Sequence, residues 1–437
     1  MEDRNTTADV VVVGGGLGGL AAATYAARGG RSVVLCEKAS ALGGRAMTTA
    51  VGDVRFNLGP HALYAGSHGI GVLRELGVAF HGGKPSASGG FAIHRGAKHA
   101  LPGGFLSLVT TSLFGLPAKL ETARLLGSFG RVDPGPQASV PIGDWIAANI
   151  RHPVVQELVG ALVRVATYTN DPQRLSAGAA LAQVQSALSA SVLYLDGGWQ
   201  TLADGLRDAA AAAGVRIATA ARATAVERNG SAWRVRLADG TAIAAAAAVV
   251  AGGPDVAAAL LSGAEQALAR RWTAEAIPVK AACLDLALSR LPEPRATFAL
   301  GIDRPLYLSV HSAVAKLGPA GTAVIHVAKY LGSAASDPKA DERELEALLD
   351  LVQPAWRTAV HERRFLPDML VANALPTAAG GGTKGRPGPA VPGADGLYVV
   401  GDWVGPHGML ADASLASAKQ AAALIVQRAV NSPRAAA

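Results

Sequence analysis

Three glycines near the N-terminus, Gly14, Gly16 and Gly19, have a spacing that can hold a pyrophosphate. They follow the apolar run DVVVV, which suits a buried parallel strand, and precede LAAATYAARGG, which suits a helix that ends at two glycines. Here the first glycine allows a tight turn, the second lets the backbone approach phosphates, and the third lets the helix pack on the strand. Because a helix N-terminus adds free N–H groups, the segment predicts a dinucleotide site rather than a glycine-rich turn without a ligand.

Glu37 lies 21 residues after Gly16, at the end of a second apolar run, SVVLC. A carboxylate at this strand end accepts hydrogen bonds from a ribose 2′-hydroxyl and disfavours a 2′-phosphate. We therefore expect an adenosine diphosphate group beside Glu37. This residue does not distinguish NAD from FAD.

Gly43, Gly44 and Arg45 follow the acidic strand end. Together with the glycine fingerprint and Glu37, they resemble the N-terminal signature of the flavin amine oxidase superfamily. The resemblance implies FAD as the cofactor and places Arg45 near its phosphates. The alternative for Arg45 is a loop arginine paired with a surface carboxylate, a weak and common arrangement.

A second match lies near the other end of the chain, in GLYVVGDWVGPHGMLADASLASAKQAA. The family has a strand, a Gly-Asp pair, a turn and a helix in this region. Gly401 and Asp402 match the position where an aspartate accepts a hydrogen bond from the ribityl chain, although Asp402 alone also suits a turn or helix cap. Residues 409–414 are expected to present backbone N–H groups to the pyrimidine edge of the flavin, where they stabilise its anionic reduced form.

The middle of the chain indicates which branch of the superfamily the sequence resembles. LDGGWQTLADGLRDAAAAAGVRI resembles an element of phytoene desaturases and protoporphyrinogen oxidases, and the strand with Val226 matches the one whose backbone holds the adenine. GPHALY at 59–64 resembles the segment beneath the isoalloxazine ring, whereas 97–190 and 276–390, where substrate is expected, match weakly. The residues expected to contact FAD are Gly14, Gly16, Leu17, Gly18, Gly19, Glu37, Lys38, Gly43, Gly44, Arg45, Pro60, His61, Val226, Gly401, Asp402, Gly408, Met409, Leu410 and Ser414.

Two side chains are candidates for catalysis, Lys280 and His61. Lys280 resembles the lysine that amine oxidases keep near flavin N5, where it relays a proton or activates oxygen; the alternative is an exposed strand-edge lysine. His61 belongs to the segment near the ring and suits a base or an oxyanion partner, or a structural hydrogen bond in a turn. Aromatic residues that suit either a pocket wall or the core are Tyr168, Tyr194, Tyr307, Tyr330, Trp199 and Trp403.

The elements that must position these residues form an alternating pattern. Residues 9–38 predict a right-handed βαβ unit, and helical patterns occupy 97–190. We predict an α/β fold with a Rossmann-type FAD-binding domain (GR2-like) and an interleaved α+β substrate domain. The FAD-binding domain is expected to comprise 1–96, 191–275 and 391–437. The substrate domain is expected to comprise a helical part at 97–190 and a sheet part at 276–390.

Composition limits the class of protein. Of the 437 residues, 50% are hydrophobic and 17% charged, which suits large buried cores, and the net charge of +7 is scattered without a nucleic-acid signature. Cys36 and Cys283 lie in apolar runs and read as buried free thiols, so we expect no disulfide framework and no metal site. The N-terminus lacks the pattern of a secretory signal, and the most apolar run is too short to span a bilayer. We therefore expect a cytoplasmic protein.

The segment GFLSLVTTSLFGLPAKLETARLL leaves two readings open. It suits an amphipathic helix that covers a substrate cavity. It also resembles the apolar patch of membrane-associated members of the carotenoid branch, in which case Lys119 and Arg124 would face lipid headgroups. We therefore retain peripheral membrane contact as an expectation to be tested.

The preferred function is an FAD-dependent dehydrogenase or desaturase that removes a hydride from an apolar small molecule or biosynthetic intermediate, with oxygen or another compound as electron acceptor. The alternatives are an amine oxidase that produces imine and hydrogen peroxide, and an isomerase that uses reduced FAD without net redox change. A non-enzymatic alternative resembles the Rab GDP dissociation inhibitors, which share the fold and bind a protein without flavin. Intact Glu37, Arg45 and Asp402 disfavour it. The sequence does not indicate an oligomeric state.

Overall fold

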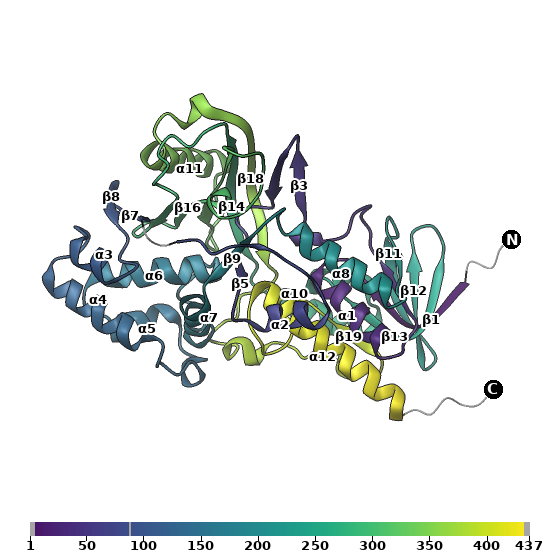
Figure 1. Ribbon diagram of the computed structural model, residues 1–437. Helices are drawn as coiled ribbons and strands as arrows, with labels where there is room; N and C mark the ends of the chain where they lie inside the picture. Colours follow the sequence, from purple (N-terminus) through teal and green to yellow (C-terminus); the bar gives the residue numbers. More distant parts are fainter. Residues whose placement is uncertain (1–4, 87–88, 432–437) are drawn as a thin grey trace.

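The computed structural model describes residues 5–86 and 89–431 and contains two large sheets (Figure 1). The first has the order β10-β2-β1-β13-β12-β11, with β19 also paired to β13. Its strands run parallel except for β12, which is antiparallel to both β11 and β13. They are β1 (Asn5–Val13), β2 (Val33–Cys36), β10 (Arg216–Ala218), β11 (Ala223–Asn229), β12 (Ala232–Leu237), β13 (Ala242–Val250) and β19 (Leu397–Val399).

Helices cover both faces of the first sheet, as parallel strands rich in valine require. On one face, α1 (Leu17–Arg28) packs against α8 (Gln200–Ala212) and α12 (Leu410–Asn431), and α2 (His68–Glu75) packs against α12. On the other face, α9 (Pro254–Leu260) and α10 (Gly263–Glu275) share a core with the edge hairpin. The buried strand ends are thereby shielded on both sides, and their carboxyl ends meet at one edge.

The second sheet has the order β18-β14-β17-β16-β15-β7-β8. One face packs against α11 (Pro338–Val352), and the other shares a core with the helical layer. Its strands are β7 (Phe91–His94), β8 (Ala97–Ala100), β14 (Val279–Leu288), β15 (Phe298–Gly301), β16 (Leu306–Val310), β17 (Ala323–Tyr330) and β18 (Val360–Ala372).

The helical layer forms one end of the molecule in Figure 1. It contains α3 (Phe105–Thr110), α4 (Leu116–Phe129), α5 (Ile142–Asn149), α6 (Pro153–Thr167) and α7 (Ala177–Ala190). Proline in the first turn of α4 and α6 favours helix initiation there. A backbone N–H group in a first turn has no acceptor within the helix, so proline, which lacks this group, loses no hydrogen bond. The short strands that join the layers are β3 (Thr48–Val51), β4 (Val54–Asn57), β5 (Leu63–Tyr64), β6 (Gly82–Gly83) and β9 (Val192–Leu195).

The predicted α/β fold with a Rossmann-type sheet is confirmed. The first sheet takes its strands from three separated parts of the chain, residues 5–36, 216–250 and 397–399. One predicted domain boundary does not agree with the strand pairing. β7 lies within the segment 1–96 that was assigned to the FAD-binding domain, but it pairs with β15 of the second sheet. The hairpin β7–β8 straddles residue 96, and a hairpin stays within one sheet because its two strands pair with each other.

Candidate functional site

The glycine fingerprint forms a turn between β1 and α1 that leaves open space at one position. Gly14 has φ +115°, and a Cβ atom on it would lie 2.4 Å from the Ala251 carbonyl oxygen. A Cβ atom on Gly19 would lie 1.9 Å from the Gly14 oxygen, so both positions require glycine for packing. A Cβ atom on Gly16 would meet nothing closer than the Gly43 oxygen at 3.9 Å. Gly16 therefore leaves room beside the first turn of α1, where a pyrophosphate would lie.

Glu37 follows directly after β2 and lines the same cavity as Gly16. One of its carboxylate oxygens accepts a hydrogen bond from the Gly15 N–H at 2.6 Å, and the other accepts one from the Ala39 N–H at 2.8 Å. These contacts fix the carboxylate beside the glycine turn. Each oxygen retains a lone pair with which a ribose hydroxyl can bond.

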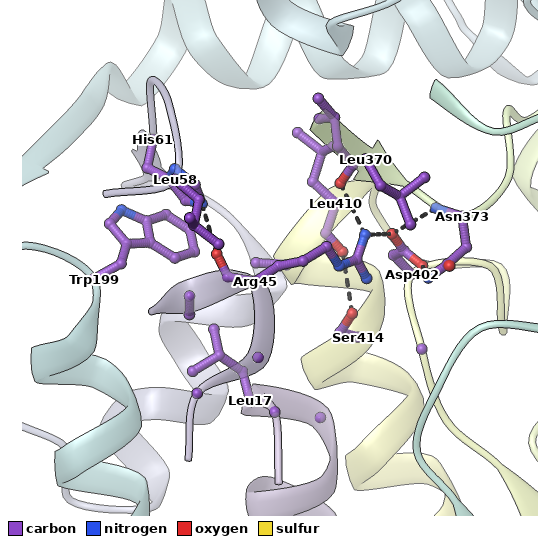
Figure 2. A pocket seen from close by; sticks show the side chains of 18 of the residues that line it. Leu17, Arg45, Leu58, His61, Trp199, Leu370, Asn373, Asp402, Leu410 and Ser414 are labelled. Carbon is purple, nitrogen blue, oxygen red and sulfur yellow. Dashed lines mark hydrogen bonds and ion pairs between the residues drawn. The ribbon is translucent and has the colours of Figure 1, made fainter. Parts of the chain in front are cut away.

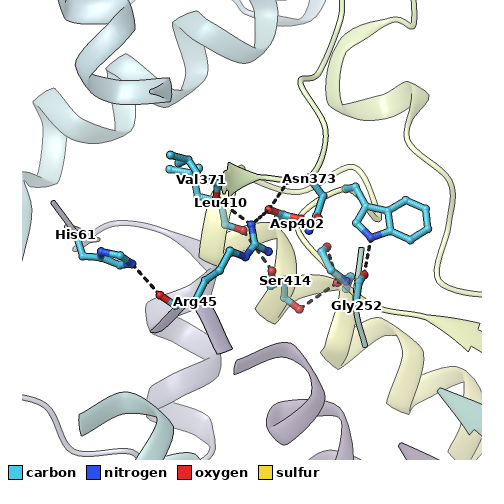
Figure 3. Close-up of polar contacts among 11 residues, drawn as sticks. Arg45, His61, Gly252, Val371, Asn373, Asp402, Leu410 and Ser414 are labelled. Atoms are coloured by element: carbon cyan, nitrogen blue, oxygen red, sulfur yellow. Dashed lines mark hydrogen bonds and ion pairs between the residues drawn. The ribbon is translucent and has the colours of Figure 1, made fainter. Parts of the chain in front are cut away.

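The loop at Gly43 to Arg45 lies against the glycine turn, because the Gly43 N–H donates to the Gly15 oxygen at 2.9 Å. From this loop Arg45 extends across the cavity (Figure 3). Its Nη1 donates to Asp402 Oδ2 at 2.6 Å and to the Val371 carbonyl oxygen at 2.8 Å. Arg45 thus pairs with a buried carboxylate, and the alternative of a surface pair is wrong.

Asp402 is 1% exposed and is held by two residues. Besides Arg45, Asn373 donates to it twice, from its backbone N–H at 3.0 Å and from Nδ2 at 2.7 Å. Burial acts to raise the pKa of Asp402, but Arg45 and Asn373 outweigh it and hold that pKa below its ordinary value. Asn373 was not predicted. It follows β18 in a region of weak resemblance and belongs to no recognisable motif.

His61 lines the cavity with both ring nitrogens close to carbonyl oxygens. Nδ1 lies 3.2 Å from the Gly59 oxygen and Nε2 lies 3.1 Å from the Arg45 oxygen. Burial lowers the pKa of His61 to about 4, so the ring is neutral at pH 7. A neutral imidazole donates from one nitrogen only, whereas an imidazolium would donate to both carbonyls. Its ring also packs edge-on against Trp199, with centroids 4.9 Å apart.

The start of α12 closes another side of the cavity. Leu410 begins the helix in the left-handed region at φ +55°, and Met409, Leu410 and Ser414 all line the cavity. Asp412, which was not predicted, also lines it and is 6% exposed. Its Oδ1 accepts hydrogen bonds from Ser67 Oγ at 2.5 Å and from the Gly69 N–H at 3.1 Å. Burial nevertheless raises the pKa of Asp412 to about 6.

These groups surround one cavity of about 430 Å³. Figure 2 shows Leu17 on one side of Arg45, and Leu58, His61 and Leu370 on the other. The predicted residues that line the cavity are Gly14, Gly16, Leu17, Gly18, Gly19, Glu37, Lys38, Gly43, Gly44, Arg45, Pro60, His61, Gly401, Asp402, Met409, Leu410 and Ser414. Of the aromatic candidates, Tyr168 and Trp199 line it as well.

Three predicted residues do not line the cavity. The Lys280 side chain is 38% exposed and its Nζ pairs with Asp368 Oδ2 at 2.8 Å, so its position does not support a role beside the flavin. The Val226 side chain is fully buried in the core between the edge hairpin and α9. Gly408 lies in the turn before α12, where its oxygen accepts a hydrogen bond from Arg386 at 2.9 Å. The remaining aromatic candidates are core residues: Tyr194, Tyr307, Tyr330 and Trp403.

A phosphate cradle at the edge of a Rossmann-type sheet, with a cavity beyond it, is typical of dinucleotide-binding proteins. The sequence model of the family of flavin containing amine oxidoreductases matches residues 17–426 of the chain, so the chain belongs to this family. The cofactor is therefore FAD, and the chain is an FAD-dependent oxidoreductase. The residues fit this group, since Gly16 leaves open space, Glu37 is a ribose acceptor and Arg45 is a cation in the cavity. Family membership also disfavours the flavin-free alternative.

Solved structures share the fold over almost the whole chain. An oxidoreductase from Methanosarcina mazei has a TM-score of 0.75 at 18% identity, over 97% of this chain and 100% of that one. Putrescine oxidase has a TM-score of 0.74 at 14% identity, over 97% and 100%. Cyclohexylamine oxidase from Brevibacterium oxydans has a TM-score of 0.72 at 16% identity, over 96% and 99%. At these identities the likeness concerns the fold.

A curated relative matches over a short stretch. The carotenoid 3,4-desaturase of Haloarcula japonica is 56% identical over 52 residues. The match covers 12% of this chain and 10% of that protein. It therefore contributes a likeness to a desaturase over a short part of the chain.

Proposed function

We propose that this oxidoreductase removes a hydride from a C–H bond of an apolar small molecule or biosynthetic intermediate, with flavin N5 as the acceptor. The observation that supports this proposal is the lining of the cavity beyond Arg45 in Figure 2. The side chains there include Leu58 and Leu370, and Met369 also lines the cavity. Leu58 and Leu370 carry no charge, and Arg45 pairs with Asp402, so this part of the cavity suits a neutral, apolar substrate.

When bound, FAD supplies a two-electron acceptor for the hydride. The chain contributes binding, orientation and exclusion of water. Gly16 and the first turn of α1 would hold the phosphates, while Tyr168, whose hydroxyl donates to the Pro60 oxygen at 2.8 Å, fixes the wall near His61. An apolar wall beside the flavin would favour hydride transfer because it helps to keep water from the reacting carbon.

His61 is the candidate acceptor of the proton that leaves the substrate in a desaturation, since forming a C=C bond from two C–H bonds releases one hydride and one proton. The resting ring is neutral, but burial lowers its pKa to about 4 and makes it a weak base, so this role requires that its neighbours stabilise the imidazolium. The imidazolium would then donate to the Gly59 and Arg45 oxygens, which already lie within hydrogen-bond distance. Lys280 receives no role in this proposal because it lies outside the cavity.

Amine oxidation is the second candidate, because two aromatic rings, Tyr168 and Trp199, line the cavity and aromatic side chains are suited to hold an amine. Anaerobic mixing of the oxidised protein with apolar polyene precursors, and separately with a panel of amines, distinguishes the two. We expect the polyene to bleach the flavin bands. Bleaching by an amine, with hydrogen peroxide formed in air, would overturn the desaturase assignment. Reoxidation by oxygen and by a quinone then identifies the class of electron acceptor.

Peripheral membrane contact is a further part of the proposal. Phe105, Leu106, Leu116 and Leu120 of α3 and α4 are 84%, 74%, 70% and 65% exposed, and Arg124 lies exposed on α4. An apolar face with an exposed arginine nearby suits an anionic lipid surface, whereas Lys119 is half-buried and its Nζ donates to the Val109 oxygen. Co-sedimentation with phosphatidylserine vesicles should fall when Phe105 and Leu116 are both replaced by Ser. Among the described residues, no helix combines the length and apolar character needed to cross a membrane. A cytoplasmic location stays a prediction.

A further inference from the structure

A buried ionic cluster lies on the three strands at one edge of the second sheet, outside the cavity lining. It consists of Asp285 on β14, His326 on β17 and Arg364 on β18, which face one another in register on three neighbouring strands. His326 Nδ1 lies 2.6 Å from Asp285 Oδ1, and Arg364 donates to Asp285 Oδ2 from Nε at 3.2 Å and from Nη2 at 2.6 Å. The side chains of Asp285 and His326 are 0% exposed.

A cluster of this kind adds little to stability. Desolvation of two charges offsets most of their attraction, and apolar residues of similar volume commonly serve as well. The flanking residues Cys283, Leu284, Leu286 and Ala287 are buried and apolar, so Asp285 is the one charged residue in this part of the strand. The cluster is charge-balanced when His326 is neutral, because Asp285 then pairs with Arg364 alone. A function in orientation is therefore a better explanation than a contribution to stability.

Arg364 connects the cluster to the wall of the flavin cavity. Its Nη2 also donates to the backbone oxygen of Asn57, at the end of β4. The Asn57 side chain is buried, and its Oδ1 accepts hydrogen bonds from the backbone N–H of Trp199 at 2.9 Å and from Thr48 Oγ1 at 2.7 Å. Trp199 in turn packs against His61, and both residues line the cavity. A continuous set of contacts thus joins the second sheet to the wall.

The approach of the chain at this point is close. Gly198 precedes Trp199 with φ +81°, and a Cβ atom on it would lie 2.7 Å from Asn57 Oδ1 and 2.5 Å from Thr48 Oγ1. The peptide that carries Trp199 therefore rests directly on the Asn57 amide. A displacement of Asn57 would move the indole, since no side chain separates the two segments.

We propose that Arg364 and Asn57 are positioning residues that fix the Trp199 and His61 wall of the flavin cavity. Asp285 orients the Arg364 guanidinium, whose planar fork serves the carboxylate and the Asn57 oxygen together. A lysine has the charge without the fork, so it can hold one of the two partners. This inference rests on the flavin site and on neither the substrate class nor the role of His61.

The test compares Arg364→Lys and Asn57→Ala holoprotein with wild type by the visible spectrum of the bound flavin, its midpoint potential and the FAD dissociation constant. We expect shifted flavin bands, a dissociation constant raised about tenfold, and a potential changed by about 30 mV, the value for a tenfold change in a two-electron equilibrium. The matched control is Asp341→Asn. This change weakens the ion pair between the buried Asp341 and Lys329, in which Oδ1 and Nζ lie 2.7 Å apart. It should leave the spectrum, midpoint potential and affinity of the flavin unchanged.

Both variants can lose thermal stability, so stability alone decides nothing. If Asn57→Ala does not fold, Arg364→Lys carries the test, because it retains the charge that balances Asp285. Trp199→Phe completes a double-variant cycle with Arg364→Lys, in which the changes in the flavin spectrum should be non-additive. A spectrum, potential and FAD affinity like those of wild type in folded Arg364→Lys would overturn the inference. None of these readouts needs a substrate, so they stand apart from the test of the proposed function.

Discussion

Two buried aspartates of this protein pair with arginine in different surroundings. Asp402 lies in the wall of the flavin cavity, and its partner Arg45 is 39% exposed. Asp285 lies inside the second sheet, where its partner Arg364 is 23% exposed and His326 is fully enclosed. The first pair lies where a ligand can exchange hydrogen bonds with it, whereas the second has contacts only within the protein. The same type of ion pair can therefore contribute to ligand binding in one part of the protein and to the positioning of neighbouring segments in another.

The largest expected effect is that of Asp285→Ala. The change leaves the Arg364 charge inside the sheet without its partner, and breaking a buried pair in this way costs about 3–5 kcal/mol. Urea unfolding should show this loss in the free energy of unfolding. Asp285→Asn, which retains an oxygen acceptor, should lose less. Equal losses in both variants would contradict the assignment of a charged pair.

Asp412 provides a third buried aspartate, which pairs with Ser67 and Gly69 instead of an arginine. Burial raises its pKa to about 6, so the folded state binds a proton more tightly than the unfolded state does. Its contribution to stability is present below pH 4 and is lost as pH rises through 6, by about 2–3 kcal/mol in total. The difference in unfolding free energy between wild type and Asp412→Asn, measured from pH 4 to 7, isolates this term. A flat difference would show that the group is not shifted.

Asp402→Ala should cost less stability than Asp285→Ala, about 2 kcal/mol, because water can solvate the partly exposed Arg45. It should, however, reduce the FAD content of the purified protein strongly. Absorbance of the bound flavin per protein measures this. Asp285→Asn is the matched comparison and should lose less flavin, because Asp285 acts on the cavity only through Arg364 and Asn57. Equal loss of FAD in both variants would remove the distinction between the two pairs.

Glu37→Ala should raise the FAD dissociation constant about tenfold, which corresponds to about 1.4 kcal/mol, because the ribose loses a charged acceptor. Glu37→Gln should retain part of the affinity through its remaining oxygen. Glu227→Ala, on the edge hairpin of the same sheet, is the control and should bind FAD as wild type does. Unchanged flavin content in Glu37→Ala would refute the ribose assignment.

The smallest expected effect is that of Lys280→Ala. Lys280 pairs with Asp368, which is 60% exposed, and exposed pairs contribute about 0.5 kcal/mol or less. We expect unchanged FAD binding and unchanged flavin reduction. A large fall in the rate of flavin reduction, with stability unchanged, would restore Lys280 as a catalytic candidate.

The cavity floor was predictable because phosphate and ribose chemistry restricts residue types at fixed spacing, as at Gly14, Gly16 and Glu37. The contacts that complete it were not. Asn373 reaches Asp402 from a loop without a motif, and Arg364 meets Asn57 across 307 positions of sequence. When a single charged residue stands in an apolar strand, the sequence indicates that the residue is buried but does not indicate which residue it pairs with. The role expected of Lys280 came from a family position that the fold places on an exposed part of β14.

The separation of the first sheet into three parts of the chain also has a consequence for synthesis. β19 joins this sheet only after residue 397 has left the ribosome, and α12 covers α1 later still. Until then, the apolar faces of β1, β13 and α1 lack part of their cover, so the nascent chain exposes a surface that chaperones bind. The order of translation thus makes the flavin site one of the last features of the protein to be completed.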